Sequence, residues 1–223
     1  MKRSTTPWPL SDLEPNGAQL AAAVKARLGW FCRHASAHVR FLNMLSLMEH
    51  VGSRKIMASQ TKESLSGETL RHLAEEARHA FFFKHAAEKM GRRPLNYSAA
   101  ETFAPAAARG YMGRLDASIA RDFANGDEGP LPYLYMSLII ELRAVWFYQL
   151  YQETLTENDH GLSLRSVLAE EELHLNAMLA HLTELDTDCA SRVTRFRALE
   201  QQRFSILWDA VEAECGRVLL AAE

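Results

Sequence analysis

Apolar residues recur at intervals of three and four positions along most of the 223-residue chain. This spacing is typical of helices that bury one face. A half-buried strand would instead alternate apolar and polar residues, and the chain contains no sustained alternation. The pattern therefore predicts an all-α protein.

Helix start and stop signals divide the chain into segments. The first predicted segment runs from about residue 16 to residue 60, with a bend at Gly29. The next helix starts near Ser66 and stops at Gly91, where Pro94 completes a Gly-then-Pro stop signal. Further helices are predicted at about 109–124, 132–157, 163–185 and 190–217.

The lengths of the connections predict how the long helices are arranged. Two connections are short, and short connections join antiparallel neighbours. The connection that begins with residues 92–108 is long and allows a crossover along the bundle. We expect residues 1–223 to form a single helical domain, with a four-helix bundle at about 29–185 and a C-terminal helix at about 190–217.

One seven-residue phrase occurs once in each half of the chain, as LAEEARH at 73–79 and LAEEELH at 168–174. Heptads laid through the two helices place Glu76 with His79, and Glu171 with His174, on the seam that faces the core. In each pair the residues are three positions apart and are therefore neighbours on the helix surface. The repeat predicts two matched Glu-x-x-His pairs that point inward.

The other two long helices each carry one carboxylate, Glu49 or Glu141, in a mostly apolar seam. Burying four carboxylates without compensation costs several kcal/mol for each one, with mutual repulsion added. Two divalent cations would cancel the four charges, and two imidazoles would complete the coordination. The predicted ligands are Glu49, Glu76, His79, Glu141, Glu171 and His174.

Two other interpretations of the repeated phrase stay open. Glu75 or Glu170 could act with the histidine four residues later, although this register moves the carboxylate off the apolar seam. A single Glu-x-x-His pair is also typical of a solvated helix surface. A structural bundle that holds no metal would need its four seam glutamates protonated or exposed.

At these residues the chain resembles the ferritin-like superfamily of dinuclear carboxylate proteins, over about residues 29–185. Residues 75–79, EEARH, are also similar to the D-E-x-R-H phrase of bacterial multicomponent monooxygenases, with Glu75 where Asp is usual. The resemblance implies a ferritin-like four-helix bundle with a long crossover and additional helices. It implies terminal ligands Glu49 and Glu141, bridging and catalytic ligands Glu76 and Glu171, and one imidazole for each metal from His79 and His174. Arg78 would lie beside the ligands.

Two further histidines are expected near one end of the ligand set. His72 precedes the ligands on its helix, and His181 follows them on the other. If the two helices run in opposite directions, both lie roughly 6–10 Å from the metals, one or two turns away. There they would line an entrance or relay protons. Histidines buried for structure alone are the alternative.

Composition limits the cellular location and the classes of binding partner that we expect. The net charge of −3 provides no basic excess for nucleic acid, and the three cysteines form no C-x-x-C pair. The first residues lack the apolar stretch of a signal peptide, and no apolar run is as long as a membrane span. A cytoplasmic protein that binds neither membrane nor nucleic acid is expected.

The resemblance implies a non-haem di-iron oxygenase or oxidase that uses O2 on a small, apolar organic substrate. Since the chain has no flavin fingerprint and no iron–sulfur motif, electrons are expected from an external ferredoxin or reductase. The alternatives are a ferroxidase or other iron-handling protein, and a di-manganese, catalase-like enzyme, because this ligand set accepts several metals. The last predicted helix would cover the bundle or pair two chains as a homodimer.

Overall fold

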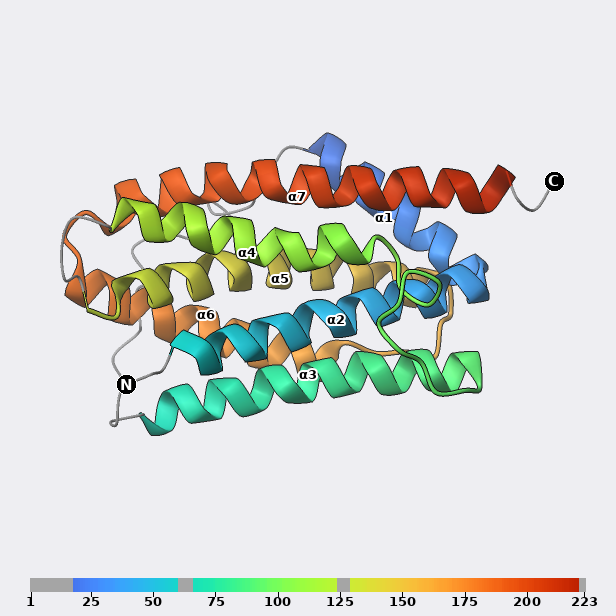
Figure 1. Cartoon of the computed structure of the whole chain (residues 1–223), viewed down its shortest axis with the longest axis horizontal. Coiled ribbons are helices and arrows are strands. Elements are labelled where there is room, and N and C mark those ends of the chain that lie inside the picture. Colours follow the sequence, from blue (N-terminus) through green and yellow to red (C-terminus); the bar gives the residue numbers. More distant parts are fainter. Residues whose placement is uncertain (1–17, 60–65, 124–128, 221–223) are drawn as a thin grey trace. The chain divides into compact units, whose positions relative to one another are not determined.

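The computed structural model describes residues 18–59, 66–123 and 129–220, and within these ranges it contains seven α-helices and no strand. The prediction of an all-α protein is confirmed. The helices are α1 Ala18–Arg33, α2 Ala35–Ser59, α3 Gly67–Gly91, α4 Pro105–Asp122, α5 Leu131–Glu157, α6 Arg165–Leu185 and α7 Cys189–Leu220 (Figure 1).

The chain divides into two compact units. One consists of Met1–Leu28 and Asp116–Gln201, and the other of Gly29–Leu115 and Gln202–Glu223. Helices α5 and α6 belong to the first unit and α2 and α3 to the second, while α1, α4 and α7 are each divided between them. Each unit therefore contains one complete pair of consecutive long helices.

The first helical segment breaks at His34, so the bend predicted at Gly29 is wrong in position. The backbone N–H of His34 donates to the carbonyl of Phe31 at 3.0 Å. Its imidazole stacks on Trp30, with Nδ1 2.7 Å from the carbonyl oxygen of Trp30. These contacts give partners to carbonyls that the end of a helix leaves without intrahelical bonds.

In the second unit, α2 and α3 run side by side in opposite directions (Figure 1). Ser66 caps α3, since its hydroxyl accepts a hydrogen bond from the backbone N–H of Thr69 at 3.0 Å. The helix ends at Gly91, as predicted, and Arg92 follows in the left-handed conformation at φ 53°. The face of α3 that is buried consists of His72, Glu76, His79, Ala80, Phe83 and Ala87.

In the first unit, α5 and α6 form a second antiparallel pair (Figure 1). Helix α5 is apolar almost all round and is buried over most of its length. Its buried polar side chains therefore lie in a mainly apolar environment. On α6 the buried positions are Val167, Glu171, Leu175, Met178, Leu179 and Leu182.

His160, in the turn between α5 and α6, makes stability depend on pH. Its Nδ1 accepts a hydrogen bond from the backbone N–H of Leu162 at 3.2 Å, and burial lowers its pKa from the ordinary 6.5. Because the unfolded chain then binds more protons, stability is lost as pH falls through 6.5 towards the lowered pKa.

We expect His160→Asn to reduce the loss of stability at acidic pH, because asparagine keeps a hydrogen-bond acceptor but does not titrate. Urea unfolding of both proteins at pH 7.5 and 5.5, as chosen assay values, measures the difference. Equal losses of stability in the two proteins would contradict the prediction.

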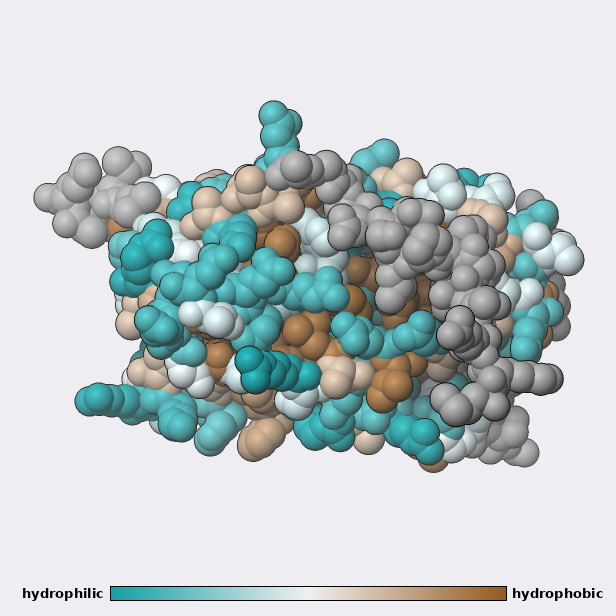
Figure 2. All heavy atoms as spheres, turned by 180° about the vertical axis from the view of Figure 1, so that it is seen from behind, coloured by the Kyte–Doolittle hydropathy of each residue, from teal (hydrophilic) through white to brown (hydrophobic). Residues whose placement is uncertain are grey.

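Hydrophilic side chains predominate on the face drawn in Figure 2, and hydrophobic residues are visible between them. Among the large apolar side chains that are exposed are Phe81 of α3 and Leu173 of α6. In the part of the chain that the structure describes, no helix has the length and apolar character needed to cross a membrane.

Candidate metal centre

The second unit gathers Glu49, Glu76 and His79, here called the α2–α3 cluster. Each side chain offers one ligand atom, and these atoms lie within 4.8 Å of one another. Glu76 and His79 are one turn apart on the buried face of α3, and Glu49 comes from α2, the helix packed beside it. All three residues are at most 7% exposed, so they form a buried acidic and imidazole site.

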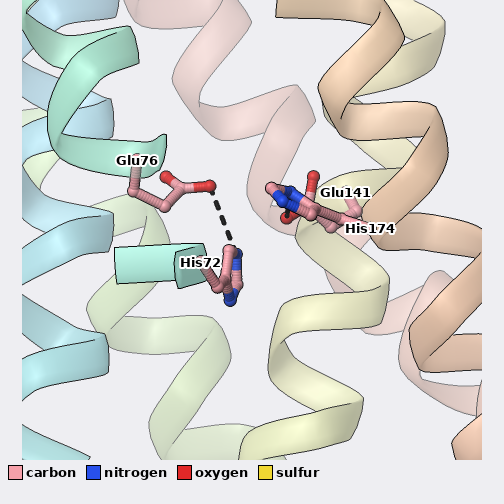
Figure 3. Close-up of side chains that lie close together, drawn as sticks. All are labelled: His72, Glu76, Glu141 and His174. Atoms are coloured by element: carbon pink, nitrogen blue, oxygen red, sulfur yellow. Dashed lines mark ion pairs between the residues drawn. The ribbon is translucent and has the colours of Figure 1, made fainter. Parts of the chain in front are cut away.

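The first unit gathers Glu141, Glu171 and His174, here called the α5–α6 cluster. The Nδ1 atom of His174 lies 3.7 Å from Glu141 Oε1 and 3.7 Å from Glu171 Oε2. Figure 3 shows Glu141 of α5 and His174 of α6 with the contact between them marked. Both carboxylates are at most 2% exposed. The imidazole of His174 thus faces two buried carboxylates through one nitrogen.

The donor atoms of both clusters suit a metal ion. Each cluster combines two carboxylates with one imidazole, a set that iron, manganese and zinc accept. The 3.7 Å separations around His174 exceed hydrogen-bond lengths of about 2.7–3.2 Å. Donor atoms about 2.1 Å from one ion, at ordinary coordination angles, lie about 3.0–3.4 Å apart. These buried histidine and glutamate groups could hold a metal ion after small movements.

A second imidazole on α3 contacts the α2–α3 cluster directly. His72 lies one turn before Glu76, with its Nε2 3.4 Å from Glu76 Oε1 (Figure 3). It is 6% exposed. The sequence predicts His72 near the ligands but one or two turns away from the metals. The structure instead places it against the carboxylate of Glu76.

The other predicted neighbours lie outside the buried clusters. The side chains of Arg78 and His181 are exposed. His181 follows His174 by seven residues, and a strict seven-residue repeat would keep both on the same face of α6, but His181 is exposed. An ideal helix drifts by about 20° per heptad from a strict seven-residue repeat, so the buried stripe has moved to Leu179 and Leu182.

Burial also bears on the choice between the two registers of the repeated phrase. Glu76 and Glu171 are buried, whereas Glu75 and Glu170 are only partly buried. A carboxylate that is shielded from water has more to gain from binding a cation. The register with the histidine three residues after the glutamate therefore fits the structure better.

Gly52 of α2 gives the carboxylate of Glu76 its space. A Cβ atom at this position would lie 3.2 Å from Glu76 Oε2 and 3.5 Å from Met112 Cε. The first distance is shorter than nine in ten real Cβ contacts, so the carboxylate would have to shift by a few tenths of an ångström. The structure thus identifies Glu76 as a residue whose side chain uses the space that Gly52 leaves.

We expect Gly52→Ala to disturb the cluster while Gly113→Ala does not. Both glycines are inside helices of the second unit, but a Cβ at Gly113 would meet nothing within 4 Å. Gly113→Ala should stabilise the chain by about 0.5–1 kcal/mol through helix propensity. Gly52→Ala should stabilise it less and weaken metal affinity roughly tenfold.

Urea unfolding and metal titration of the two alanine variants test this expectation. Equal stability gains, together with equal metal affinities, would contradict it.

Each unit thus carries two buried glutamates and one histidine, drawn from a pair of antiparallel helices, and the side chain of His174 is 14% exposed. Comparisons of the chain with models of protein families, with curated proteins and with solved structures found no match. The function of the chain is therefore inferred from the residues of the two clusters.

Proposed function

We propose that the α2–α3 and α5–α6 clusters together bind two iron ions, and that the chain is a non-haem di-iron oxidoreductase. It would use O2 to oxidise or oxygenate a small, apolar organic substrate. The observation that supports this proposal is the matched composition of the two clusters. Each has two buried carboxylates and one imidazole, and each is built around one copy of the repeated phrase.

Charge is the physical reason for two ions. Four ionised glutamates carry four negative charges, and each buried carboxylate loses its hydration. Two divalent ions neutralise all four charges, whereas one would leave two uncompensated. The two imidazoles bind as neutral donors and leave this balance unchanged. Two ions are therefore the number that the donor set favours.

The residues of the two clusters would hold the ions. Glu49 and Glu76 would supply the carboxylates of the α2–α3 cluster, and Glu141 and Glu171 would supply those of the α5–α6 cluster. His79 and His174 would supply one imidazole to each ion. Bound iron would supply the electron transfer to O2 and the oxidation of the substrate. The protein would hold the metals and orient the substrate.

Apolar residues next to the clusters would keep water away. Phe83 follows His79 by one turn on α3, and Met178 follows His174 by one turn on α6. Both side chains are buried. Because a dry environment strengthens electrostatic interactions, these side chains favour tight binding of the cations. Apolar surroundings of this kind also support the proposal of an apolar substrate.

The proposed reaction needs electrons from another protein. The sequence has no flavin fingerprint and no iron–sulfur motif, so we propose a ferredoxin or reductase as the donor. The donor would dock where electrons can reach the metals.

Metal analysis followed by O2 uptake tests the proposed function. The full chain is loaded anaerobically with Fe²⁺, freed of excess metal, reduced, and mixed with O2. We expect about two irons per chain and consumption of O2. Two manganese ions per chain, bound in preference to iron, would indicate a catalase-like enzyme. No bound metal after loading with either ion would mean that the repeated phrase is structural.

A further inference from the structure

His72 is a buried imidazole that the ligand set described above does not use. Its Nε2 faces Oε1 of Glu76, a residue that already belongs to the α2–α3 cluster. We propose that His72 is a third histidine ligand of the metal centre and binds through Nε2. This inference rests on the proposed function and adds one nitrogen donor to it.

The distance between the two side chains supports coordination. A charge-assisted N–H···O contact between imidazole and carboxylate is about 2.7–2.9 Å long. The Nε2–Oε1 distance of His72 and Glu76 is 3.4 Å. It falls in the range of about 3.0–3.4 Å expected for two donor atoms on one ion. The pair is therefore spaced as two ligands would be, and more widely than a strong hydrogen bond.

The position of His72 on α3 places its side chain on the same face of the helix as Glu76 and His79. Residues four positions apart lie on the same face of a helix, and His72 precedes Glu76 by four while His79 follows it by three. All three are on the buried face of the helix. Helix α3 thus presents two imidazoles on either side of one carboxylate (Figure 3 shows His72 and Glu76).

The corresponding position on α6 is different. Counting four residues back from Glu171 leads to Val167, an apolar side chain that is also buried. The α5–α6 cluster therefore has no equivalent of His72. If His72 binds, the full ligand set contains three imidazoles. A neutral nitrogen donor leaves the charge balance unchanged, but it occupies a coordination position that water would otherwise fill.

Cobalt-loaded protein tests the proposal without any activity assay. The full chain, labelled with ¹⁵N-histidine, is loaded with Co²⁺ alone and studied by ¹H NMR in H2O and in D2O. Each imidazole bound through one nitrogen retains an N–H on the other, which gives a strongly shifted, exchangeable signal. We expect three such signals in the unmodified chain and two in His72→Gln, with cobalt affinity at least about tenfold weaker.

His85→Gln is the matched control, because His85 lies on the same helix with an exposed side chain. It should keep three signals. Two shifted signals in the unmodified chain that persist in His72→Gln would overturn the third ligand and leave the proposed function intact. No bound cobalt in the unmodified chain would overturn both. If His72→Gln does not fold, as judged by circular dichroism, His72→Val imitates Val167 and serves in its place.

Discussion

Glu76→Gln and Glu171→Gln should each abolish tight metal binding and make the metal-free protein more stable. Both carboxylates are almost fully buried, and each lies within a cluster that contains a second carboxylate. Glutamine keeps the shape but removes one charge, so the repulsion within the metal-free cluster falls. We expect a gain on the order of 1 kcal/mol without metal, as is common when a strained functional site is relieved.

The same variants should lose the stabilisation that metal gives to the unmodified chain. A ligand at a thousand times its dissociation constant stabilises a protein by about 4 kcal/mol. Thermal unfolding with and without Fe²⁺ measures this difference, and metal analysis gives the ions per chain. The control is Glu172→Gln, whose carboxylate lies on the exposed side of α6. Full metal content in both cluster variants would contradict the ligand assignment.

Arg143→Met should cost about 3–5 kcal/mol of stability, because it removes the guanidinium that pairs with the buried carboxylate of Glu200. The guanidinium donates to both oxygens of Glu200, at 2.8 Å and 2.6 Å, and to Gln201 Oε1 at 2.6 Å. It also lies 4.8 Å from the ring centre of Trp146. Arg143 and Glu200 are only 4% and 2% exposed, so water cannot replace the lost partner.

The double variant Arg143→Met with Glu200→Leu distinguishes a lost ion pair from lost packing. Removing both charges together should restore much of the stability, since apolar side chains often replace a buried ion pair at little cost. Lys25→Met is the exposed control, because Lys25 pairs with Glu153 and Glu157 at the surface. It should have a much smaller effect. A loss below about 1 kcal/mol for Arg143→Met in urea unfolding would contradict the prediction.

Periodicity determined the helical class, and start and stop signals placed most helix boundaries to within a few residues. The predicted helix from Ser66 to Gly91 agrees with α3, and the one at 132–157 agrees with α5 within one residue. These features follow from local chemistry, because caps, glycines and apolar spacing act over one or two turns. The same locality allowed the sequence to pair Glu76 with His79 and Glu171 with His174, since residues three apart share a face.

Features that depend on packing were decided by the tertiary structure. The sequence placed the first bend at Gly29, whereas the structure breaks the helix at His34, whose ring stacks on Trp30. His181 became exposed because a small angular drift accumulates along a straight helix until the partner helix covers other positions. The close approach of Gly52 to Glu76 depends on how tightly two helices pack.

The position of His72 combines both kinds of information. His72 precedes Glu76 by four residues in the sequence, and this spacing places the two side chains on one face of α3. That its ring turns towards the carboxylate, 3.4 Å away, depends on a side-chain rotamer selected by the surrounding core. The sequence by itself thus determined which residues could meet, and only the packed structure decided which atoms do.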